Sequence, residues 1–427
     1  MKTSKELLYQ RYISPIKDNP QLLIGVELEF PIVHTEGRAT DTTVTKELLA
    51  YLARQEAFEC VQKDEDGACV QVRHCHSGDM ILFEVSYNIL EFAFSPAITI
   101  QSIEKRFQDY LTLIQTFLVA HHHELQGWGV HPHWAINDNS PVKLPRYQML
   151  MNYLALAKKG LQNGYHEYSD YGAFICGSQV QLDVTRDNLI PTLNTFNQLE
   201  PIKAYLFANS ELKVGGWETY LSRDIFWEES MHGTHRENIG LYDHDFTDID
   251  DLVTYLDKSS LFTVERQGKI LYFPPIAAKD YLHQDHIEAY DLDGKKVTII
   301  PQEADFTYHR SYNYEDLTTR GTIEFRSTCT QPLNQTFSVV AFHLGIFLNM
   351  DKVSQYLLNL PLYEKYHHDY AKMRRLFASK TLSEDDYKAL KEASQILLKL
   401  ATEGLKTRFN AEESYLSPLF EKNQKNS

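Results

Sequence analysis

The sequence predicts an α+β fold built around a largely antiparallel sheet. Short stretches in which apolar and polar residues alternate with a period of two are interleaved with longer stretches of helical periodicity. The two kinds of stretch do not alternate strictly, which favours antiparallel strands over a doubly wound parallel sheet. No repeat, low-complexity tract or long linker divides the 427 residues. We therefore expect a body spanning residues 1–350 and a helical C-terminal region spanning residues 351–427, packed on the same domain.

The expected elements follow in chain order. The strands are rich in branched and aromatic residues and cover residues 24–33, 68–75, 80–85, 88–94, 173–184, 262–273 and 319–330. The helices place apolar residues three and four positions apart and cover residues 42–55, 102–125, 145–161, 199–210 and 333–349, with helix continuing to the C-terminus.

The first expected strand, IGVELEFPIV, carries two acidic residues in an otherwise apolar run. Residues i and i+2 of a strand point to the same face, so Glu27 and Glu29 project together. Val26, Leu28 and Phe30 project to the opposite face. Two adjacent carboxylates repel each other, so a core strand that carries such a pair calls for an explanation.

Other strands repeat this arrangement of polar residues on one face. A half-solvated antiparallel strand is the simpler explanation of any single case. A solvated face, however, usually carries Lys, Thr and Ser, whereas these faces collect Glu, Gln and Arg within very apolar strands. Several carboxylates gathered on one sheet face would repel unless a cation lay between them. The residues concerned are Gln179, Gln181 and Asp183 in GSQVQLDV, Glu91 in NILEFAFSP, and Glu324 and Arg326 in TIEFRST.

A hard divalent cation fits such a set of side chains. Mg²⁺ prefers carboxylate and water oxygens and commonly binds together with substrate phosphates. Glutamates clustered with arginine therefore indicate a nucleotide site, where guanidinium groups contact phosphate oxygens. The chain has no GxxxxGK[ST] loop and no GxGxxG turn. Its phosphate site is therefore expected to consist of side chains and metal ions.

Composition narrows the class of protein. The formal net charge of -16 argues against nucleic acid as the main partner, because phosphate binding needs a basic surface. The start, MKTSKELLYQRYISPIKDNP, lacks the apolar core of a signal peptide, and the longest apolar stretch is too short to span a bilayer. We therefore expect a cytoplasmic protein without a membrane partner.

Cysteines and histidines bear on possible metal sites. The 5 cysteines are scattered and form no CxxC pair, which predicts mostly buried thiols rather than a disulfide framework or a thiolate zinc site. Histidines at residues 121–123 and at His131 and His133 leave an imidazole zinc site as an alternative. The first group ends an expected helix, however, where histidine suits the helix dipole.

The motifs, taken together, resemble those of glutamate-cysteine ligases of the type found in plants and many bacteria, within the carboxylate-amine ligases. The similarity runs over nearly the whole chain, and the motifs occur in the same order. The resemblance implies a curved, largely antiparallel six-stranded sheet that forms a funnel, with helices packed outside. The matching motifs are GVELEF, EVSYNILEFAFSP, GVHPHW followed by PRYQ, SQVQLDV, LFANS, SRDIFW with GTHREN, GTIEFRS and GLKTRF.

The resemblance also implies roles for individual residues. Binding of Mg²⁺, or of Mn²⁺ in its place, is implied for Glu27, Glu29, Glu84, Glu91 and Glu324. Gln179 and Gln181 match residues that line the floor of the active site in this family. Arg326 matches the basic residue that lies near the ATP phosphates. Arg223 matches the residue that holds a substrate carboxylate, and Arg236 matches a residue that binds nucleotide phosphate or substrate.

The implied reaction is ATP-dependent formation of γ-glutamylcysteine from glutamate and cysteine through a γ-glutamyl phosphate, by a monomer or homodimer. Where many relatives read asparagine-serine-proline, this chain reads Asn209-Ser210-Glu211, which leaves another small amine as an alternative to cysteine. A catalytically quiet relative that binds a nucleotide or amino acid is the second alternative. Retention of the glutamates together with Arg326 favours catalysis.

Overall fold

A nine-stranded sheet lies at the centre of the computed structural model, which describes residues 2–159, 165–213 and 216–425. Each neighbouring pair of its strands is antiparallel. This confirms the α+β expectation with a largely antiparallel sheet. The strands run in the order β14 (Glu315–Leu317), β15 (Thr322–Phe325), β7 (Ser178–Asp183), β1 (Ile24–His34), β5 (Ile89–Ala97), β4 (Met80–Phe83), β3 (Cys69–His74) and β2 (Phe58–Lys63), with β6 (His123–Leu125) paired to the end of β1.

The sheet is wider than the six strands that the resemblance implied. Short strands extend the hydrogen-bonded ladder at its margins: β2 continues it beyond β3, β14 continues it beyond β15, and β6 pairs with the last residues of β1. Strands β6 and β14 have three residues each, too few to produce a periodic sequence signal, whereas the six residues of β2 alternate between buried and more exposed positions.

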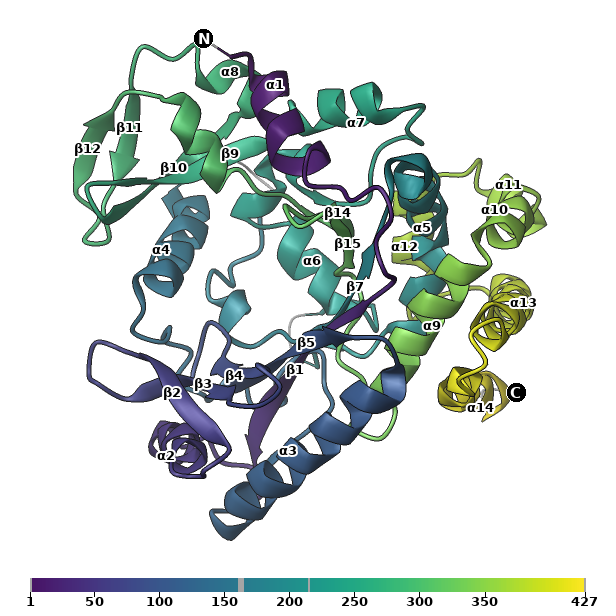
Figure 1. Cartoon of the computed structure of the whole chain (residues 1–427), viewed down its shortest axis with the longest axis horizontal. Helices are drawn as coiled ribbons and strands as arrows, with labels where there is room; N and C mark the ends of the chain where they lie inside the picture. The colour runs from purple at the N-terminus through teal and green to yellow at the C-terminus, as the bar shows by residue number, and fades with distance from the viewer. Residues whose placement is uncertain (1, 160–164, 214–215, 426–427) are drawn as a thin grey trace.

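A second sheet lies apart from the first. It contains four strands in the order β12 (Lys296–Ile299), β11 (Ile287–Tyr290), β10 (Lys269–Ala277) and β9 (Ser260–Arg266). The stretch 262–273, expected as one strand, forms the β9–β10 hairpin of this sheet, with Gly268 in the turn at a φ of 73°. Two further short strands, β8 (Ile239–Gly240) and β13 (Tyr312–Asn313), pair in parallel. Figure 1 shows the four-stranded sheet and the β2–β4 strands on opposite sides of α4 and α6.

The helices cover the main sheet and build the C-terminal region. Their bounds are α1 (Ser4–Leu8), α2 (Thr42–Ala53), α3 (Ile100–Ala120), α4 (Pro145–Leu154), α5 (Arg186–Phe207), α6 (Ser222–Glu228), α7 (Ile249–Leu256), α8 (Ala278–Tyr281), α9 (Phe337–Leu348), α10 (Met350–Leu358), α11 (Pro361–Lys365), α12 (Tyr370–Phe377), α13 (Glu384–Lys406) and α14 (Ser417–Lys425). None of the helices described is long and apolar enough to cross a membrane.

Three helix predictions need correction. The helix expected over 102–125 ends at Ala120, because His122 adopts a φ of 59° and the chain then enters β6. The helix expected over 145–161 ends as α4 at Leu154 and continues as 3₁₀ turns, and its last two residues lie outside the described part of the chain. The helix expected over 199–210 begins earlier, at α5, because the Thr185 side chain caps its N-terminus.

The apolar face of the main sheet forms the core. Val26, Leu28 and Phe30 of β1 are buried on this face. Phe107 of α3 packs on it, with its ring centroid 5.7 Å from that of Phe30 and 5.2 Å from that of Phe92. Helix α3 therefore covers one side of the sheet, and the opposite face remains for other side chains (Figure 1).

The C-terminal helices join the body through a close contact between α9 and α13. A Cβ added to Gly404 of α13 would lie 2.1 Å from the carbonyl oxygen of Gly345 in α9, so only glycine allows the two backbones to approach this closely. Helix α9 is buried along most of its length.

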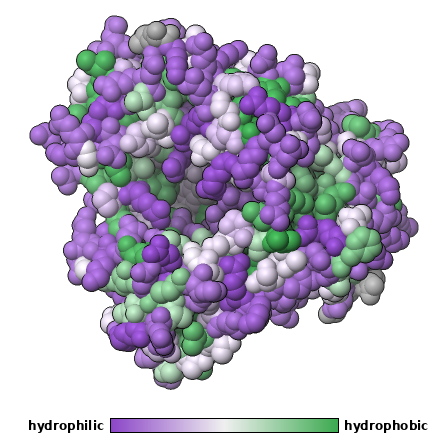
Figure 2. Space-filling model, viewed as in Figure 1, coloured by the Kyte–Doolittle hydropathy of each residue, from purple (hydrophilic) through white to green (hydrophobic). Residues whose placement is uncertain are grey.

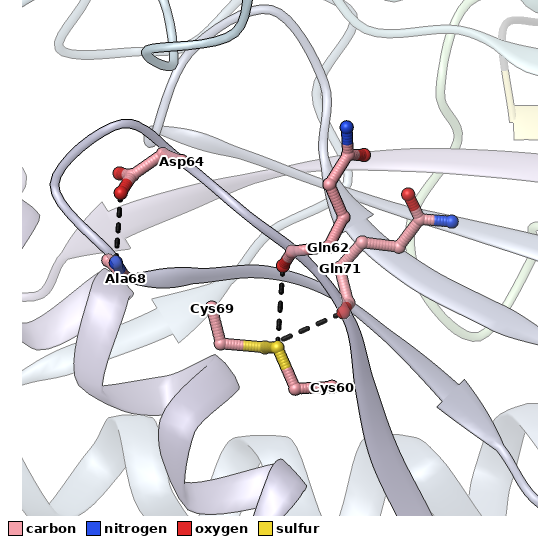
Figure 3. The surroundings of a disulfide bond; sticks show 6 residues. All are labelled: Cys60, Gln62, Asp64, Ala68, Cys69 and Gln71. Atoms are coloured by element: carbon pink, nitrogen blue, oxygen red, sulfur yellow. Dashed lines mark hydrogen bonds between the residues drawn. A yellow bond between two sulfur atoms is a disulfide. The ribbon is translucent and has the colours of Figure 1, made fainter.

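One cysteine prediction is wrong. Cys60 and Cys69 form a disulfide across the β2–β3 hairpin, with their Cα atoms 6.0 Å apart, whereas Cys176 and Cys329 are buried thiols and Cys75 is exposed. The turn between the two half-cystines is closed by Asp64, whose side chain accepts a 2.8 Å hydrogen bond from the Ala68 amide (Figure 3). The β2–β3 hairpin brings together these two cysteines, which are nine positions apart in the sequence.

Candidate active site

One face of the main sheet collects the acidic and amide side chains singled out in the sequence. Directly opposed residues of an antiparallel pair point to the same face. Glu29 of β1 lies opposite Glu91 of β5, and Glu27 lies opposite Gln179 of β7. Gln181 of β7 in turn lies opposite Glu324 of β15. The residues that share this face, called here the acidic face, are Glu27, Glu29, Glu91, Gln179, Gln181 and Glu324.

The acidic face is turned away from α3, because the apolar residues of the same strands pack on that helix. Helices α4 and α6 lie on the acidic side, as the contacts of Tyr147 and Arg223 described below establish. Viewed as in Figure 1, the molecule is hollowed near the centre of this view, and mainly hydrophilic residues surround the hollow (Figure 2).

Glu84 joins the acidic face from the turn after β4. The hydroxyl of Tyr147, in α4, donates a 2.7 Å hydrogen bond to Glu84 Oε2. Val85, the next residue, has a φ of 56°, which is unusual for a β-branched residue and costs conformational energy. The surrounding structure therefore holds Glu84 in place rather than leaving it in a relaxed loop.

Amide groups fix the two glutamates of β1. The backbone amide of Gly177 donates to Glu29 Oε2 at 2.6 Å, and the side-chain amide of Gln179 donates to Glu29 Oε1 at 3.3 Å. The side-chain amide of Gln181 donates to Glu27 Oε1 at 3.0 Å. These donors orient the carboxylates but add no positive charge to offset them.

Burial and neighbouring carboxylates raise the pKa of Glu27, Glu29 and Glu91. Desolvation, followed by repulsion from Glu324, raises the pKa of Glu27 to about 7. Desolvation also raises the pKa of Glu29 to about 7, although the charge of Arg223 opposes this shift. The pKa of Glu91 lies well above its usual range because of desolvation and the nearby carboxylate of Glu84. The structure thus places all five predicted metal-binding glutamates within one electrostatically coupled group.

Arg326 is one of the basic groups beside the acidic face. Its guanidinium forms an ion pair with Glu324 on the same strand and lies 5.7 Å from the ring centroid of Tyr312. This pairing leaves the more distant glutamates, on β1 and β5, without a cationic partner within ion-pair distance among the residues described.

Arg223, at the start of α6, carries a buried guanidinium group. It is 4% exposed, and its Nη1 donates a 2.9 Å hydrogen bond to the carbonyl oxygen of Arg326. Within the part of the chain that the structure describes, no carboxylate forms an ion pair with it, and its Nε has no hydrogen-bond partner. By contrast, the buried Arg374 pairs with both Glu200 and Asp224. Glu29 is near enough for the two charges to interact but lies beyond ion-pair distance, so the buried guanidinium can still receive an anion.

Arg236 is not among the residues that the strand pairing and contacts described above bring to the acidic face. It is exposed, in a short 3₁₀ turn after α6, and lines a cavity of about 620 Å³ together with Lys372 and Arg375. None of the five glutamates lines that cavity. Arg236 therefore lines a cavity to which the five glutamates do not contribute.

Three residues of the site were missed in the sequence. Arg146 and Tyr147 belong to the motif PRYQ, for which the sequence implied no role. The Tyr147 hydroxyl donates a hydrogen bond to Glu84, and the Arg146 guanidinium lies 4.3 Å from the Tyr147 ring centroid. Asp316 of β14 lies directly opposite Glu324, and desolvation raises its pKa to about 7. The position of PRYQ could have indicated Arg146 and Tyr147, whereas the three residues of β14 carry no periodic signal.

The acidic face fits a hard divalent cation by its chemistry. Oxygen ligands from carboxylates suit Mg²⁺ and Mn²⁺, and a bound cation would offset the charge of carboxylates that are buried close together. Among the residues described, no group of three or more His, Cys, Asp or Glu side chains is already arranged to hold a metal ion. Mg²⁺ does not require such a cage, because it keeps several waters and commonly binds through one or two carboxylates and substrate phosphates.

Cation affinity is expected to rise with pH. Glu27 and Glu29 have a pKa of about 7, so below that pH a proton competes with a cation for each carboxylate. From pH 6 to pH 8 we expect the dissociation constant for Mn²⁺, measured by calorimetric titration, to fall by at least about tenfold. In the absence of cations, the raised pKa values stabilise the folded protein fully below the unfolded pKa of 4.5, and this stabilisation is lost as the pH rises through 7.

The control for this prediction is the variant Glu27→Gln. Its neutral side chain cannot titrate, so the pH dependence of Mn²⁺ affinity should become weaker. An affinity for Mn²⁺ that is equal at pH 6 and pH 8 in the unaltered protein would contradict the prediction.

A family model and several known proteins are similar to this chain. The family model described as Glutamate-cysteine ligase family 2 matches residues 23–422. A chloroplastic glutamate–cysteine ligase from Nicotiana tabacum is 24% identical over 311 residues, which cover 69% of this chain and 54% of the relative. The enzyme of the same name from Solanum lycopersicum is 23% identical over 310 residues, which cover 69% of this chain and 54% of the relative. The aligned segments thus span about half the length of these relatives.

A solved structure is also similar, though only distantly. The structure of a glutamate–cysteine ligase from Francisella tularensis in complex with AMP aligns over 95% of this chain and 99% of its own, with 11% identity and a TM-score of 0.28. This likeness is too weak to bear on fold or function.

Proposed function

The chain belongs to glutamate-cysteine ligase family 2, and from this membership and the acidic face we propose that it is an ATP-dependent ligase that joins glutamate to cysteine. Its body, residues 1–350, would hold the reacting groups on the acidic face, with the C-terminal region of residues 351–427 packed against it. The hollow in Figure 2 would be the mouth of the funnel through which substrates enter.

In the proposed reaction, a side-chain carboxylate oxygen of glutamate attacks the γ-phosphorus of ATP, and the bond from that phosphorus to the bridging oxygen breaks to release ADP. The amine nitrogen of cysteine then attacks the carbonyl carbon of γ-glutamyl phosphate. The carbon–oxygen bond to phosphate breaks, the nitrogen loses a proton, and γ-glutamylcysteine and inorganic phosphate result. Such chemistry needs positioned reactants and stabilised charge rather than a protein nucleophile.

The observation that carries this proposal is the buried guanidinium of Arg223, which has no carboxylate partner and lies beside a crowded group of glutamates. The α-carboxylate of glutamate would supply the missing anion and could be held by two parallel hydrogen bonds. The free Oε1 of Gln179, which has no hydrogen-bond partner among the residues described, could accept a bond from the α-ammonium group.

The remaining residues would bind the nucleotide and its metal ion. Glu27, Glu29, Glu84, Glu91 and Glu324 would hold Mg²⁺, or Mn²⁺ in its place. When bound, the ion neutralises negative charge on phosphate oxygens. Arg326 would contact the phosphates, and Gln181, held near Glu27 by its hydrogen bond, would keep that carboxylate turned toward the ion.

Release of ADP tests the proposal. With glutamate and Mg-ATP fixed, each of a set of amines is added in turn, ADP is measured, and the product is identified by mass spectrometry. We expect release to depend on cysteine and to yield γ-glutamylcysteine. Release with a different amine alone would keep the mechanism and change the substrate, whereas no release with any amine would refute the proposal.

The compartment proposed for the protein is the cytoplasm. The acidic composition is compatible with the cytoplasm, but the disulfide between Cys60 and Cys69 is favoured by an oxidising environment. Its oxidation state in protein isolated under conditions that block thiol exchange would distinguish the two environments.

A further inference from the structure

Gly177 lies between the two groups on which the proposed function depends most. It precedes β7, and both of its backbone polar groups are used by Glu29. Its amide donates to Glu29 Oε2 at 2.6 Å, and its carbonyl oxygen accepts a 3.0 Å hydrogen bond from the backbone amide of Glu29. The position of Gly177 is therefore tied to both the backbone and the carboxylate of Glu29.

The other side of Gly177 is occupied by Arg223. A Cβ added at Gly177 would lie 2.7 Å from Arg223 Nη2 and 3.1 Å from Arg223 Cζ. It would also lie 3.3 Å from the carbonyl oxygen of Thr328. Gly177 does not have the left-handed backbone conformation that itself favours glycine. The reason for glycine at this position is therefore the space that the guanidinium takes.

Arg223 cannot move aside freely. Its backbone amide donates to Ser210 Oγ at 3.1 Å, and its Nη1 donates to the carbonyl oxygen of Arg326 at 2.9 Å. The side chain is almost fully buried. A methyl group at position 177 would therefore push the guanidinium off the Arg326 carbonyl or force the strand away from Glu29.

We propose that Gly177 is a positioning residue that lets the guanidinium of Arg223 rest against the backbone beside Glu29. It thereby sets the distance between the group that would bind the amino-acid carboxylate and the glutamates that would hold the cation. The inference rests on the proposed function for its substrate, glutamate, but the contacts among Gly177, Glu29 and Arg223 belong to the structure itself.

Gly177→Ala tests the inference. We expect the KM for glutamate, and the dissociation constant for glutamate measured by calorimetry, to rise by about 10- to 100-fold, because small displacements of a binding group have effects of that order. The KM for ATP should change much less. Gly172→Ala is the matched control: it lies in the same segment before β7, and its added Cβ would make only ordinary contacts, at 3.7 Å, with Val85. The control should retain the KM for glutamate.

A second comparison shows whether Gly177 acts through Arg223. In a protein that already carries Arg223→Lys, adding Gly177→Ala should weaken glutamate binding by much less than it does alone. Equal losses in both backgrounds would overturn the inference, as would an unchanged glutamate affinity in a folded Gly177→Ala protein. If Gly177→Ala fails to fold, Gly177→Ala combined with Arg223→Gln, which shortens the clashing side chain, should fold; failure of this protein too would refute the proposed clash.

The outcomes separate this inference from the proposed function. A protein that ligates no amine, but whose glutamate affinity falls with Gly177→Ala, would keep the positioning role and lose the proposed function. A working ligase whose Gly177→Ala variant retains its glutamate affinity would support the proposed function and refute the positioning role. A protein that binds no glutamate at all would overturn both.

Discussion

Replacing Glu27 by glutamine is expected to remove nearly all Mg-dependent ADP release while leaving the fold intact. The carboxylate lies on the acidic face within the coupled group, so its loss should remove a ligand of the cation that would stabilise the transferring phosphoryl group. A loss of several kcal/mol of such stabilisation corresponds to a fall in turnover of at least about 100-fold. The fold should be retained because glutamine keeps the size of the side chain and removes only a charge whose burial is unfavourable. The measurement is the initial rate of ADP release, together with a thermal unfolding curve.

Glu324→Gln should lower turnover similarly, but at a greater cost in stability, because it also removes the partner of Arg326. The matched control is Glu59→Gln, on the edge strand β2 of the same sheet, where Glu59 forms an exposed ion pair with Arg73. This control should keep the rate of the unaltered protein, since such pairs contribute little. Full activity in Glu27→Gln would show that the carboxylate holds no catalytic cation.

Replacing Arg223 by lysine is expected to raise the KM for glutamate by about 10- to 100-fold. Lysine keeps the positive charge but cannot offer two parallel hydrogen bonds to a carboxylate. One charge-assisted hydrogen bond contributes about 1.5–3 kcal/mol, which corresponds to about that change in affinity. The KM for ATP should change little, because the nucleotide would be bound by the glutamates and Arg326. Steady-state kinetics with each substrate varied in turn provide the measurement.

Arg73→Lys provides the comparison for this variant, because Arg73 is half exposed and belongs to the same sheet. Had Arg223 been a surface residue, a change of at most about 1 kcal/mol would be expected. Its burial excludes that explanation. A glutamate KM that stays unchanged in Arg223→Lys would mean that the anion held there is not the glutamate carboxylate.

Several features were predictable because they depend on neighbours in the sequence. The period of two in IGVELEFPIV predicted that Glu27 and Glu29 share a face opposite Val26, Leu28 and Phe30, and the structure has this arrangement. Pleating alone determines this result, whichever strand lies next to β1. The alternation of polar residues in β7 and β15 was predictable for the same reason.

Other predictions failed because the local sequence pattern is compatible with more than one structure. The stretch 262–273 reads as a strand, but its pattern does not state which sheet it joins, and it forms a hairpin of the second sheet. Helical periodicity continued through 123–125, where pairing with β1 makes a strand instead. The turn sequence between Cys60 and Cys69 could have indicated a hairpin, through the aspartate and glycine that close it, and hence the disulfide.

The sequence by itself determined the α+β class, the antiparallel tendency and the faces on which the glutamates of each strand point, because these follow from the period of side chains along an extended chain. Only the tertiary structure decided that Glu29 lies opposite Glu91 and Gln181 opposite Glu324, since register depends on hydrogen bonds between segments far apart in the chain. It also buried Arg223 beyond ion-pair distance of every carboxylate that the structure describes. These features depend on packing between segments far apart in the chain, which the local period of the sequence does not encode.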